Sequence, residues 1–287
     1  MKVGSICSGI GGLDLAVETF FGAELAWYAE NAEAPARVMA EHWPGIPNLG
    51  DITTKRWWDV PHVDILCGGY PCQPFSQAGK KKGVNDERHL WPHIRQAIRW
   101  IRPTFTILEN VSGHRKTGFD TVLGDLAEDG MYARWVSVRA SDIGAPHGRD
   151  RVFLVAATEG AWAAQAVPDT KVSGRYSWPG LLPRQQAEQR RRRSGYGDSS
   201  TVDWGVYEPA IRHWESWHGP APMPGEPGKG NRPRLIPQFE EWMMGFPPGW
   251  VTGMNIGRPD ALRAFGNAVC PPQAVHALHL LFSEGWP

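Results

Sequence analysis

The side chain best suited to nucleophilic chemistry is the thiol of Cys72, in a segment that reads Gly-Gly-Tyr-Pro-Cys-Gln-Pro-Phe-Ser-Gln over residues 68–77. This segment directly follows an apolar run at residues 63–67, so the thiol is expected at the end of a strand. A proline on either side of the Cys-Gln pair stiffens the turn. Because a few per cent of unperturbed thiols are ionised at neutral pH, such a cysteine can attack an electron-poor carbon atom. Cys72 is therefore the candidate nucleophile, whereas Cys67 and Cys270 are expected to be inert core residues.

A second apolar run, Phe105 to Val111, delivers a carboxylic acid to the same place. Glu109 lies near the end of this run, and the carboxyl ends of parallel strands meet at one edge of a sheet. Glu109 and Cys72 are therefore expected to be neighbours. A carboxyl group that burial keeps neutral can give a proton to a reacting group as negative charge develops on it.

Two arginines stand at alternate positions where another predicted strand begins, in the sequence Ala-Pro-His-Gly-Arg-Asp-Arg-Val at residues 145–152. Alternate residues of a strand point to the same face, so Arg149 and Arg151 are expected to act on one target. The alternative is that both form surface ion pairs with Asp142 or Asp150.

A glycine-rich turn after the first predicted strand indicates a bound cofactor. Its glycines permit a tight turn and close approach of a ligand to the next helix N-terminus: Gly9, Gly11 and Gly12. Glu30, after the second strand, can accept hydrogen bonds from ribose hydroxyls, and Asp51 with Ile52 can hold an adenine amino group. Such a turn serves NAD, FAD or S-adenosylmethionine alike. The alternative is that Glu30 and Asp51 only begin helices.

The elements that position these residues alternate strands and helices from residue 2 to about 156, which predicts an α/β fold with a mainly parallel, doubly wound sheet. Strands are expected at 25–29, 65–67, 106–108, 135–138 and 152–156. Helical spacing of apolar residues predicts helices in four stretches, 13–20, 90–101, 119–126 and 275–282.

The alternation ends between about 158 and 232, where Pro, Gly, Trp and Arg dominate. A small irregular region is expected there, and regular structure resumes at Pro237 to Met244. The expected division is therefore a catalytic and cofactor-binding domain at 1–157, an insertion at 158–232, and a return to the first domain at 233–287.

Composition limits the classes of protein. Lys plus Arg and Asp plus Glu each number 30, so the formal net charge is zero and any basic surface must be local. The four cysteines form no CxxC pair, which argues against a zinc cluster or a disulfide framework and for a reducing compartment. No apolar run is long enough to cross a bilayer, and the N-terminus leads straight into a strand. A cytoplasmic protein without a metal site or a membrane partner is expected.

Taken together, the Pro-Cys-Gln turn, the Glu-Asn-Val run, the glycine-rich turn and the closing Gly266-Asn267-Ala268-Val269 resemble the ordered motifs of the DNA (cytosine-5) methyltransferases of bacteria and phages. The resemblance covers nearly the whole chain outside the insertion. It implies the Rossmann-like fold of S-adenosylmethionine-dependent methyltransferases, with a small irregular target-recognition domain.

The resemblance also implies roles for the catalytic residues. Cys72 would add to C6 of a cytosine that is rotated out of the duplex, and Glu109 would act at N3. Arg149 and Arg151 match the arginines of a Gln-x-Arg-x-Arg motif, in which they hold a phosphate and the cytosine O2. His147 replaces the usual Gln of that motif.

S-adenosylmethionine is the cofactor that the resemblance implies. Ser5-Ile6-Cys7 stands where the family has Asp-Leu-Phe, so the aromatic ring that stacks on adenine is missing. Either Cys7 fills that place more weakly, or another aromatic residue, Tyr28 or Trp27, compensates. The residues expected to bind the cofactor are Cys7, Ser8, Gly9, Gly11, Gly12, Glu30, Asp51, Ile52, Asn267 and Ala268.

Double-stranded DNA is the implied substrate. A glycine-hinged loop at 76–83 is expected to close on phosphates, and the insertion is expected to read the target. The residues expected to contact DNA are Ser76, Lys80, Lys81, Lys82, Arg190, Arg191, Arg192 and Arg193. A monomer is expected, paired with a cognate restriction endonuclease or solitary, in the cytoplasm of a bacterium or of a phage host.

Three other functions remain open from the sequence. An RNA cytosine methyltransferase of the same fold would share the motifs. A catalytically silent DNA-binding relative would not need the intact Cys72 and Glu109. A dinucleotide-dependent oxidoreductase would leave the Pro-Cys-Gln turn without a purpose.

Overall fold

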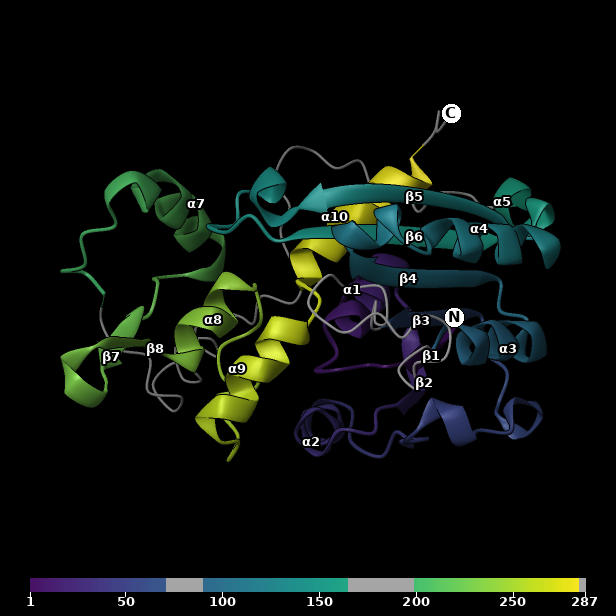
Figure 1. Cartoon of the computed structure of the whole chain (residues 1–287), viewed down its shortest axis with the longest axis horizontal. Helices are drawn as coiled ribbons and strands as arrows, with labels where there is room; N and C mark the ends of the chain where they lie inside the picture. Colours follow the sequence, from purple (N-terminus) through teal and green to yellow (C-terminus); the bar gives the residue numbers. More distant parts are fainter. Residues whose placement is uncertain (71–89, 165–198, 284–287) are drawn as a thin grey trace.

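A computed structural model of the chain describes residues 1–70, 90–164 and 199–283 (Figure 1). Among these residues, six strands form one sheet in the order β2-β1-β3-β4-β6-β5. In chain order the strands are β1 (Lys2–Ile6), β2 (Glu24–Ala29), β3 (Ile65–Gly69), β4 (Phe105–Val111), β5 (Tyr132–Arg139) and β6 (Asp150–Ala157). Neighbours among β1 to β4 run parallel, whereas β6 runs antiparallel to both β4 and β5. The predicted mainly parallel sheet is confirmed.

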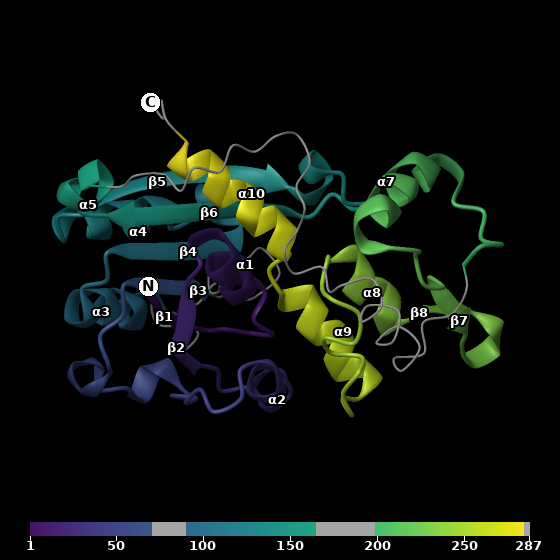
Figure 2. The ribbon, with the colours of Figure 1, turned by 180° about the vertical axis from the view of Figure 1, so that it is seen from behind.

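Helices cover both faces of this sheet. On one face lie α1 (Gly12–Phe21) and α10 (Pro271–Phe282), which are in front of the sheet in Figure 2. On the other face lie α3 (Trp91–Ile101) and α4 (Phe119–Glu128). Each helix buries the apolar stripe that its sequence spacing predicts, and each fully buried aliphatic or aromatic side chain stabilises the fold by about 1.5–3 kcal/mol. The helix α2 (Glu33–His42) and the short turns η1 (Ile52–Thr54) and η2 (Trp57–Asp59) lie between β2 and β3 in the chain.

The C-terminal helix α10 packs against the sheet of the first domain. The side chain of Gln273, which is fully buried in α10, donates to the carbonyl oxygens of Val138, at 2.7 Å, and Arg149, at 2.9 Å. These bonds join α10 to the end of β5 and to the approach to β6. A buried amide with such partners fixes the helix in one position, since an unpaired one would be costly.

The structure differs from the expectation of irregular structure at 158–232. The described parts of that range contain α5 (Glu159–Ala164), η6 (Gly205–Tyr207), α7 (Glu208–His218), β7 (Gly225–Pro227) and η7 (Lys229–Asn231). The helix α7 buries Ile211 and Trp214 at helical spacing, and the mixture of Trp, His and Glu around them hid that stripe in the sequence. α5 lies against the first domain. Trp162 packs edge-on against Phe105, with ring centroids 5.8 Å apart, and its indole donates to the carbonyl oxygen of Tyr132 at 3.0 Å.

The second region packs on helices from the C-terminal segment. After β8 (Pro233–Leu235), which pairs with β7, come α8 (Pro237–Met243) and α9 (Arg258–Asn267). The indole of Trp214 donates to the Trp242 carbonyl oxygen at 2.9 Å, and that of Trp242 donates to the Gly219 carbonyl oxygen at 3.0 Å. Figure 1 shows α9 between this region and the sheet, with α7, α8 and the β7–β8 hairpin beyond it. The turns η4 (Ser112–Lys116) and η5 (Ala140–Ile143) complete the described elements. None of the described helices is long and apolar enough to span a membrane.

Candidate active site

The buried Glu109 and the partly buried Arg151 form an ion pair at the edge of the sheet where the parallel strands end. β4 carries Glu109, and the antiparallel β6 begins at the same edge, so that Val111 stands opposite Arg151 and Glu109 opposite Phe153. Arg151 and Phe153 are two positions apart and share a face, which directs the Arg151 side chain toward Glu109. Arg151 Nε lies 2.8 Å from Glu109 Oε1.

The Glu109 carboxyl group takes up a proton far more readily than an exposed one. Its residue is 7% exposed, and burial raises its pKa from 4.5 to about 7, although Arg151 and Arg149 oppose the rise. Gly69, the last residue of β3, pairs with Glu109 in the sheet, and a Cβ at Gly69 would lie 3.2 Å from Glu109 Oε2. Oε1 is therefore held by Arg151, while Oε2 lies beside a position without a side chain. The direction of the pKa shift agrees with the predicted neutral acid.

Arg149 reaches toward the C-terminal motif. Its Nη2 donates to the carbonyl oxygen of Gly266 at 3.0 Å and to that of Ala268. Burial, with the nearby charge of Arg151, lowers its pKa to about 10. The guanidinium thus joins the start of β6 to the segment that contains Asn267, whose own residue is exposed. The predicted phosphate contact of Arg149 stays a prediction.

The structure shows the ion-pair partner of Arg151 and the contact that His147 makes. The ion pair of Arg151 is with Glu109 and not with Asp142 or Asp150, which contradicts the surface-pair alternative for this residue. His147 Nε2 forms a hydrogen bond of 3.0 Å with the carbonyl oxygen of Met243, at the end of α8. Burial lowers the pKa of His147 to about 4, so the ring is neutral at neutral pH.

The strand that leads to Cys72 is tied to the strand that carries Glu109. Tyr70 follows β3, and its backbone carbonyl oxygen accepts a hydrogen bond of 3.0 Å from Asn110 Nδ2. The Tyr70 hydroxyl and His114 Nε2 are 2.9 Å apart. Sequence reasoning missed Tyr70, Asn110 and His114, although the position of Asn110 directly after Glu109 was a signal.

The predicted cofactor residues converge from separate parts of the chain. The Gly9 N–H donates to Glu30 Oε2 at 2.7 Å. Burial and the carboxylates of Glu30 and Asp51 raise the pKa of the Cys7 thiol to about 12, which places the three side chains in one neighbourhood. A Cβ at Gly9, where φ is 57°, would meet no atom within 4 Å. This surface of the turn therefore borders open space.

The other predicted cofactor residues differ in how they are placed. Ser8 lies within the turn, where its Oγ accepts a hydrogen bond of 2.8 Å from Ser5 Oγ. Asp51 Oδ1 accepts hydrogen bonds from the backbone nitrogen and the hydroxyl of Thr53, both at 2.8 Å, and these bonds lower the pKa of Asp51. Asp51 thus begins η1, as the helix alternative proposed, and keeps its charge. Ile52 is only 4% exposed and packs in the core.

The N-terminal and C-terminal motifs meet at the glycine turn. A Cβ at Gly12 would lie 2.2 Å from the backbone oxygen of Val269, so only glycine permits this approach. The indole of Trp250 donates to the carbonyl oxygen of Ile10 at 2.8 Å. Gly11, with φ at 79°, packs against the ring of Trp43. Gly12 thus brings the glycine turn into direct contact with the last motif, which nothing in the sequence had indicated.

The prediction that Trp27 or Tyr28 replaces the missing aromatic ring is contradicted. Trp27 is 0% exposed, donates to the Pro61 carbonyl oxygen and packs under Gly4, while Tyr28 is 2% exposed. Both rings belong to β2 and point into the two cores on either side of a sheet that is covered on both faces.

Asp14 is a buried acid that sequence reasoning missed. It lies in the first turn of α1 and is 1% exposed, with Cys67 Sγ 4.0 Å from its Oδ1. Burial raises its pKa from 3.8 to about 7, although a hydrogen bond with Ser5 opposes the rise. Cys67 and Cys270 are both buried and have raised thiol pKa values, which confirms them as inert core cysteines.

Several predicted residues lie outside the described residues. These are Cys72, Ser76, Lys80, Lys81, Lys82, Arg190, Arg191, Arg192 and Arg193. The predicted proximity of Cys72 to Glu109 and the DNA contacts of the lysine and arginine runs therefore stay predictions. Within the described ranges, no group of three or more His, Cys, Asp or Glu residues is arranged to hold a metal ion.

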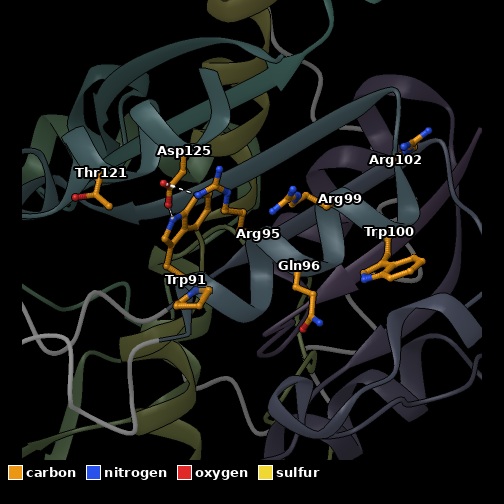
Figure 3. A pocket seen from close by; sticks show the side chains of 9 residues that line it. Trp91, Arg95, Gln96, Arg99, Trp100, Arg102, Thr121 and Asp125 are labelled. Atoms are coloured by element: carbon orange, nitrogen blue, oxygen red, sulfur yellow. Dashed lines mark hydrogen bonds and ion pairs between the residues drawn. The ribbon is translucent and has the colours of Figure 1, made fainter. Parts of the chain in front are cut away.

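A cavity of about 930 Å³ lies elsewhere, along α3 and α4 (Figure 3). It is lined by Trp91, Pro92, Arg95, Gln96, Arg99, Trp100, Arg102, Thr121 and Asp125. Arg95 is committed to α4 through ion pairs with Asp125, Glu128 and Asp129, at 2.6–3.0 Å. None of the predicted catalytic or cofactor residues that the structure describes lines this cavity.

Comparison with known proteins identifies the arrangement. The family model described as C-5 cytosine-specific DNA methylase matches residues 1–193. The chain belongs to this family. It is 31% identical to the type II methyltransferase M.NlaX of Neisseria lactamica, over 94% of this chain and 93% of that one. It is 26% identical to the type II methyltransferase M1.ScrFI of Lactococcus lactis subsp. cremoris, over 96% and 76%.

Solved structures share the fold of this methylase. A putative DNA modification methyltransferase encoded within a prophage of E. coli superposes with a TM-score of 0.65 at 18% identity, covering 99% of this chain and 100% of that one. The Dnmt2 methyltransferase of S. pombe superposes with a TM-score of 0.64 at 15% identity, covering 98% of each chain. The Rossmann-like methyltransferase fold is thus confirmed.

Proposed function

We propose that this methylase transfers a methyl group from S-adenosylmethionine to C5 of a flipped-out cytosine in a short DNA sequence, through a covalent bond between Cys72 and C6. The observation that carries the proposal is the buried Glu109, whose pKa is raised to about 7 while Arg151 holds one of its oxygens. A carboxyl group in this state can act on cytosine N3 at neutral pH.

The residues near the glycine turn fit S-adenosylmethionine. Gly9 borders open space, as does Gly50, where φ is 71°. The carboxylates of Glu30 and Asp51 approach the same neighbourhood and suit ribose hydroxyls and an adenine amino group. Each Glu30 oxygen already accepts one backbone N–H, from Gly9 or from Ala32, which orients the carboxylate and leaves further acceptor capacity. When bound, the cofactor supplies a methyl group on a positively charged sulfur.

The protein's own residues must make C5 of cytosine reactive. The Cys72 thiolate adds to C6, and electron density moves through the ring toward C5 and N3. Glu109 gives its proton, or a hydrogen bond, to N3, because a neutral carboxyl stabilises the charge that develops there. Arg151 fixes Oε1, so that Oε2 acts on the base. Once C5 is methylated, a base takes its remaining proton, the C–H electron pair restores the double bond, and the C6–S bond breaks.

DNA is the proposed substrate, because the family acts on cytosine in DNA and the relatives named above are type II methyltransferases. We propose that residues 158–232 contain the target-recognition region and that the basic runs at 80–82 and 190–193 contact phosphates. A restriction endonuclease of the same specificity is the expected partner in the cell.

The test is a methyl-transfer assay with labelled S-adenosylmethionine and mixed DNA and RNA substrates, followed by bisulfite sequencing. Label at one cytosine within a short repeated DNA sequence is the expected result. Label only in RNA would replace DNA with RNA as the substrate. Cofactor binding without any label would indicate a catalytically silent DNA-binding protein, and binding of NAD in place of S-adenosylmethionine would indicate an oxidoreductase.

A further inference from the structure

Tyr70 and Trp91 bracket the segment that contains Cys72, and their rings lie against each other. Tyr70 precedes Pro71, and Trp91 is the first residue of α3. The ring centroids are 6.1 Å apart, at an interplanar angle of 40°. Both residues are buried, at 6% and 4% exposed. The two ends of the catalytic segment therefore meet in the core.

Each end is also fixed to an element outside the segment. The Trp91 indole donates to Asp125 Oδ2 of α4 at 2.6 Å. The backbone carbonyl oxygen of Tyr70 accepts a hydrogen bond from Asn110 Nδ2. The Tyr70 hydroxyl forms a second hydrogen bond, of 2.9 Å, with His114 Nε2. Tyr70 is thus fixed at both its backbone and the tip of its side chain.

The tether of the side chain comes from the same stretch of chain as the catalytic acid. β4 carries Glu109, and η4, which follows directly, carries His114. His114 is 4% exposed and packs edge-on against Phe119, with ring centroids 5.7 Å apart. Burial lowers the pKa of His114, which keeps the ring neutral and able to share one proton with the Tyr70 hydroxyl.

Filling the core does not require the polar groups of Tyr70 and His114. Burying a hydroxyl and an imidazole costs more than burying two apolar rings of similar size unless the polar atoms are bonded to each other. Two phenylalanines would fill the same space without that cost. What the polar pair adds is direction, because a hydrogen bond fixes the rotation and depth of the Tyr70 ring.

We propose that His114 is a positioning residue for the methyl-transfer reaction, which acts through its hydrogen bond to Tyr70 to hold the nucleophile segment in register with Glu109. This inference rests on the proposed role of Cys72. One continuous stretch, residues 109–114, therefore carries the catalytic acid Glu109 and also the histidine that bonds to Tyr70, at the start of the nucleophile segment. A small displacement of reacting atoms is enough to slow a reaction severely, about 100-fold for 1 Å.

The test uses Tyr70→Phe, which removes only the hydroxyl, His114→Phe, which keeps an aromatic ring against Phe119, and the double variant. We expect kcat for DNA methylation to fall about threefold to tenfold in each single variant, with KM for DNA and for S-adenosylmethionine unchanged. The double variant should be no slower than the slower single one, because both remove the same bond. The matched control is Trp162→Phe, which loses the hydrogen bond of 3.0 Å from α5 to the Tyr132 carbonyl oxygen of β5 and should leave kcat unchanged.

A second readout does not depend on methyl transfer. The rate at which iodoacetamide alkylates Cys72, followed by mass spectrometry of its peptide, should differ between Tyr70→Phe and the unaltered protein. If all the folded variants keep the original kcat and Cys72 alkylation rate and only unfold at lower temperature, the pair is structural and the inference is wrong. If the unaltered protein does not methylate at all, the proposed function fails, and the alkylation rates alone then decide the positioning role.

Discussion

Replacing Glu109 by Gln should change the pH dependence of stability in a direction that distinguishes burial from ion pairing. Burial raises the pKa of Glu109 from 4.5 to about 7 in the folded protein, against the opposing charges of Arg151 and Arg149. Because the folded state then binds the proton more tightly than the unfolded state, this group stabilises the fold fully below about pH 4.5. That stability is lost as the pH rises through about 7.

The size of the effect follows from the shift. A difference of about 2.5 pKa units corresponds to about 3 kcal/mol of unfolding free energy. The amide of Gln cannot titrate, so the Glu109→Gln variant lacks this loss. Arg151 loses its ion-pair partner in the variant at every pH, which adds a constant penalty. Other groups, including Asp14, titrate alike in both proteins and cancel in the difference.

The assay is urea unfolding at pH 4.5 and pH 8, followed by circular dichroism. We expect the unaltered protein to lose up to about 3 kcal/mol relative to Glu109→Gln between the two values. A constant difference would mean that the carboxyl does not titrate abnormally. A relative gain in stability with rising pH would mean that the pairing with Arg151 outweighs burial and lowers the pKa. In methylation assays the same variant should lose about 100-fold or more in kcat, since it lacks the general acid.

Three further substitutions, with Gly124→Ala as a control, test the packing and the charge around the site. Gly12→Ala should destabilise the fold by about 1–3 kcal/mol in urea unfolding, because its Cβ would meet a backbone oxygen at 2.2 Å. The control Gly124→Ala, in open space on α4, should stabilise the fold by up to about 1 kcal/mol. Equal effects of the two substitutions would refute the close approach at Gly12. Gly69→Ala should lower kcat about tenfold, because its methyl group would lie 3.2 Å from Glu109 Oε2. Methylation assays measure kcat, and calorimetry should show an unchanged affinity for the cofactor. An unaltered kcat would show that this oxygen is not used. The unfolding free energy of Asp14→Asn, relative to that of the unaltered protein, should rise by up to about 4 kcal/mol between pH 4 and pH 8, since burial raises the pKa of Asp14 to about 7. Parallel curves of unfolding free energy against pH would contradict that shift.

The sequence was sufficient for the elements whose apolar pattern is periodic. α1 and α10 bury all the residues whose spacing predicted them, α3 and α4 bury most of them, and Glu109 lies in a strand as expected. α7 was missed, because its apolar stripe is short and interrupted by His and Glu. Trp27 and Tyr28 were misjudged, since a strand covered on both faces leaves no ring free for a ligand.

The contacts that define the site depend on topology, which local patterns do not contain. Arg151 reaches Glu109 only because β6 is antiparallel and begins where β4 ends. Tyr70 and His114 are 44 positions apart, and nothing in either local sequence predicts that they meet. Long-range pairs of this kind become visible only when the order and direction of the strands are known.

The central claim is that Cys72 attacks C6 of cytosine, and covalent trapping tests it most directly. DNA of random sequence that contains 5-fluorocytosine would be incubated with the protein and S-adenosylmethionine, because fluorine at C5 blocks the final loss of the C5 substituent. The digested protein would then be analysed by mass spectrometry. We predict that the peptide containing Cys72 carries the nucleotide and that Cys72→Ser forms no adduct. An adduct on another cysteine, or none in a protein that methylates ordinary DNA, would contradict the account.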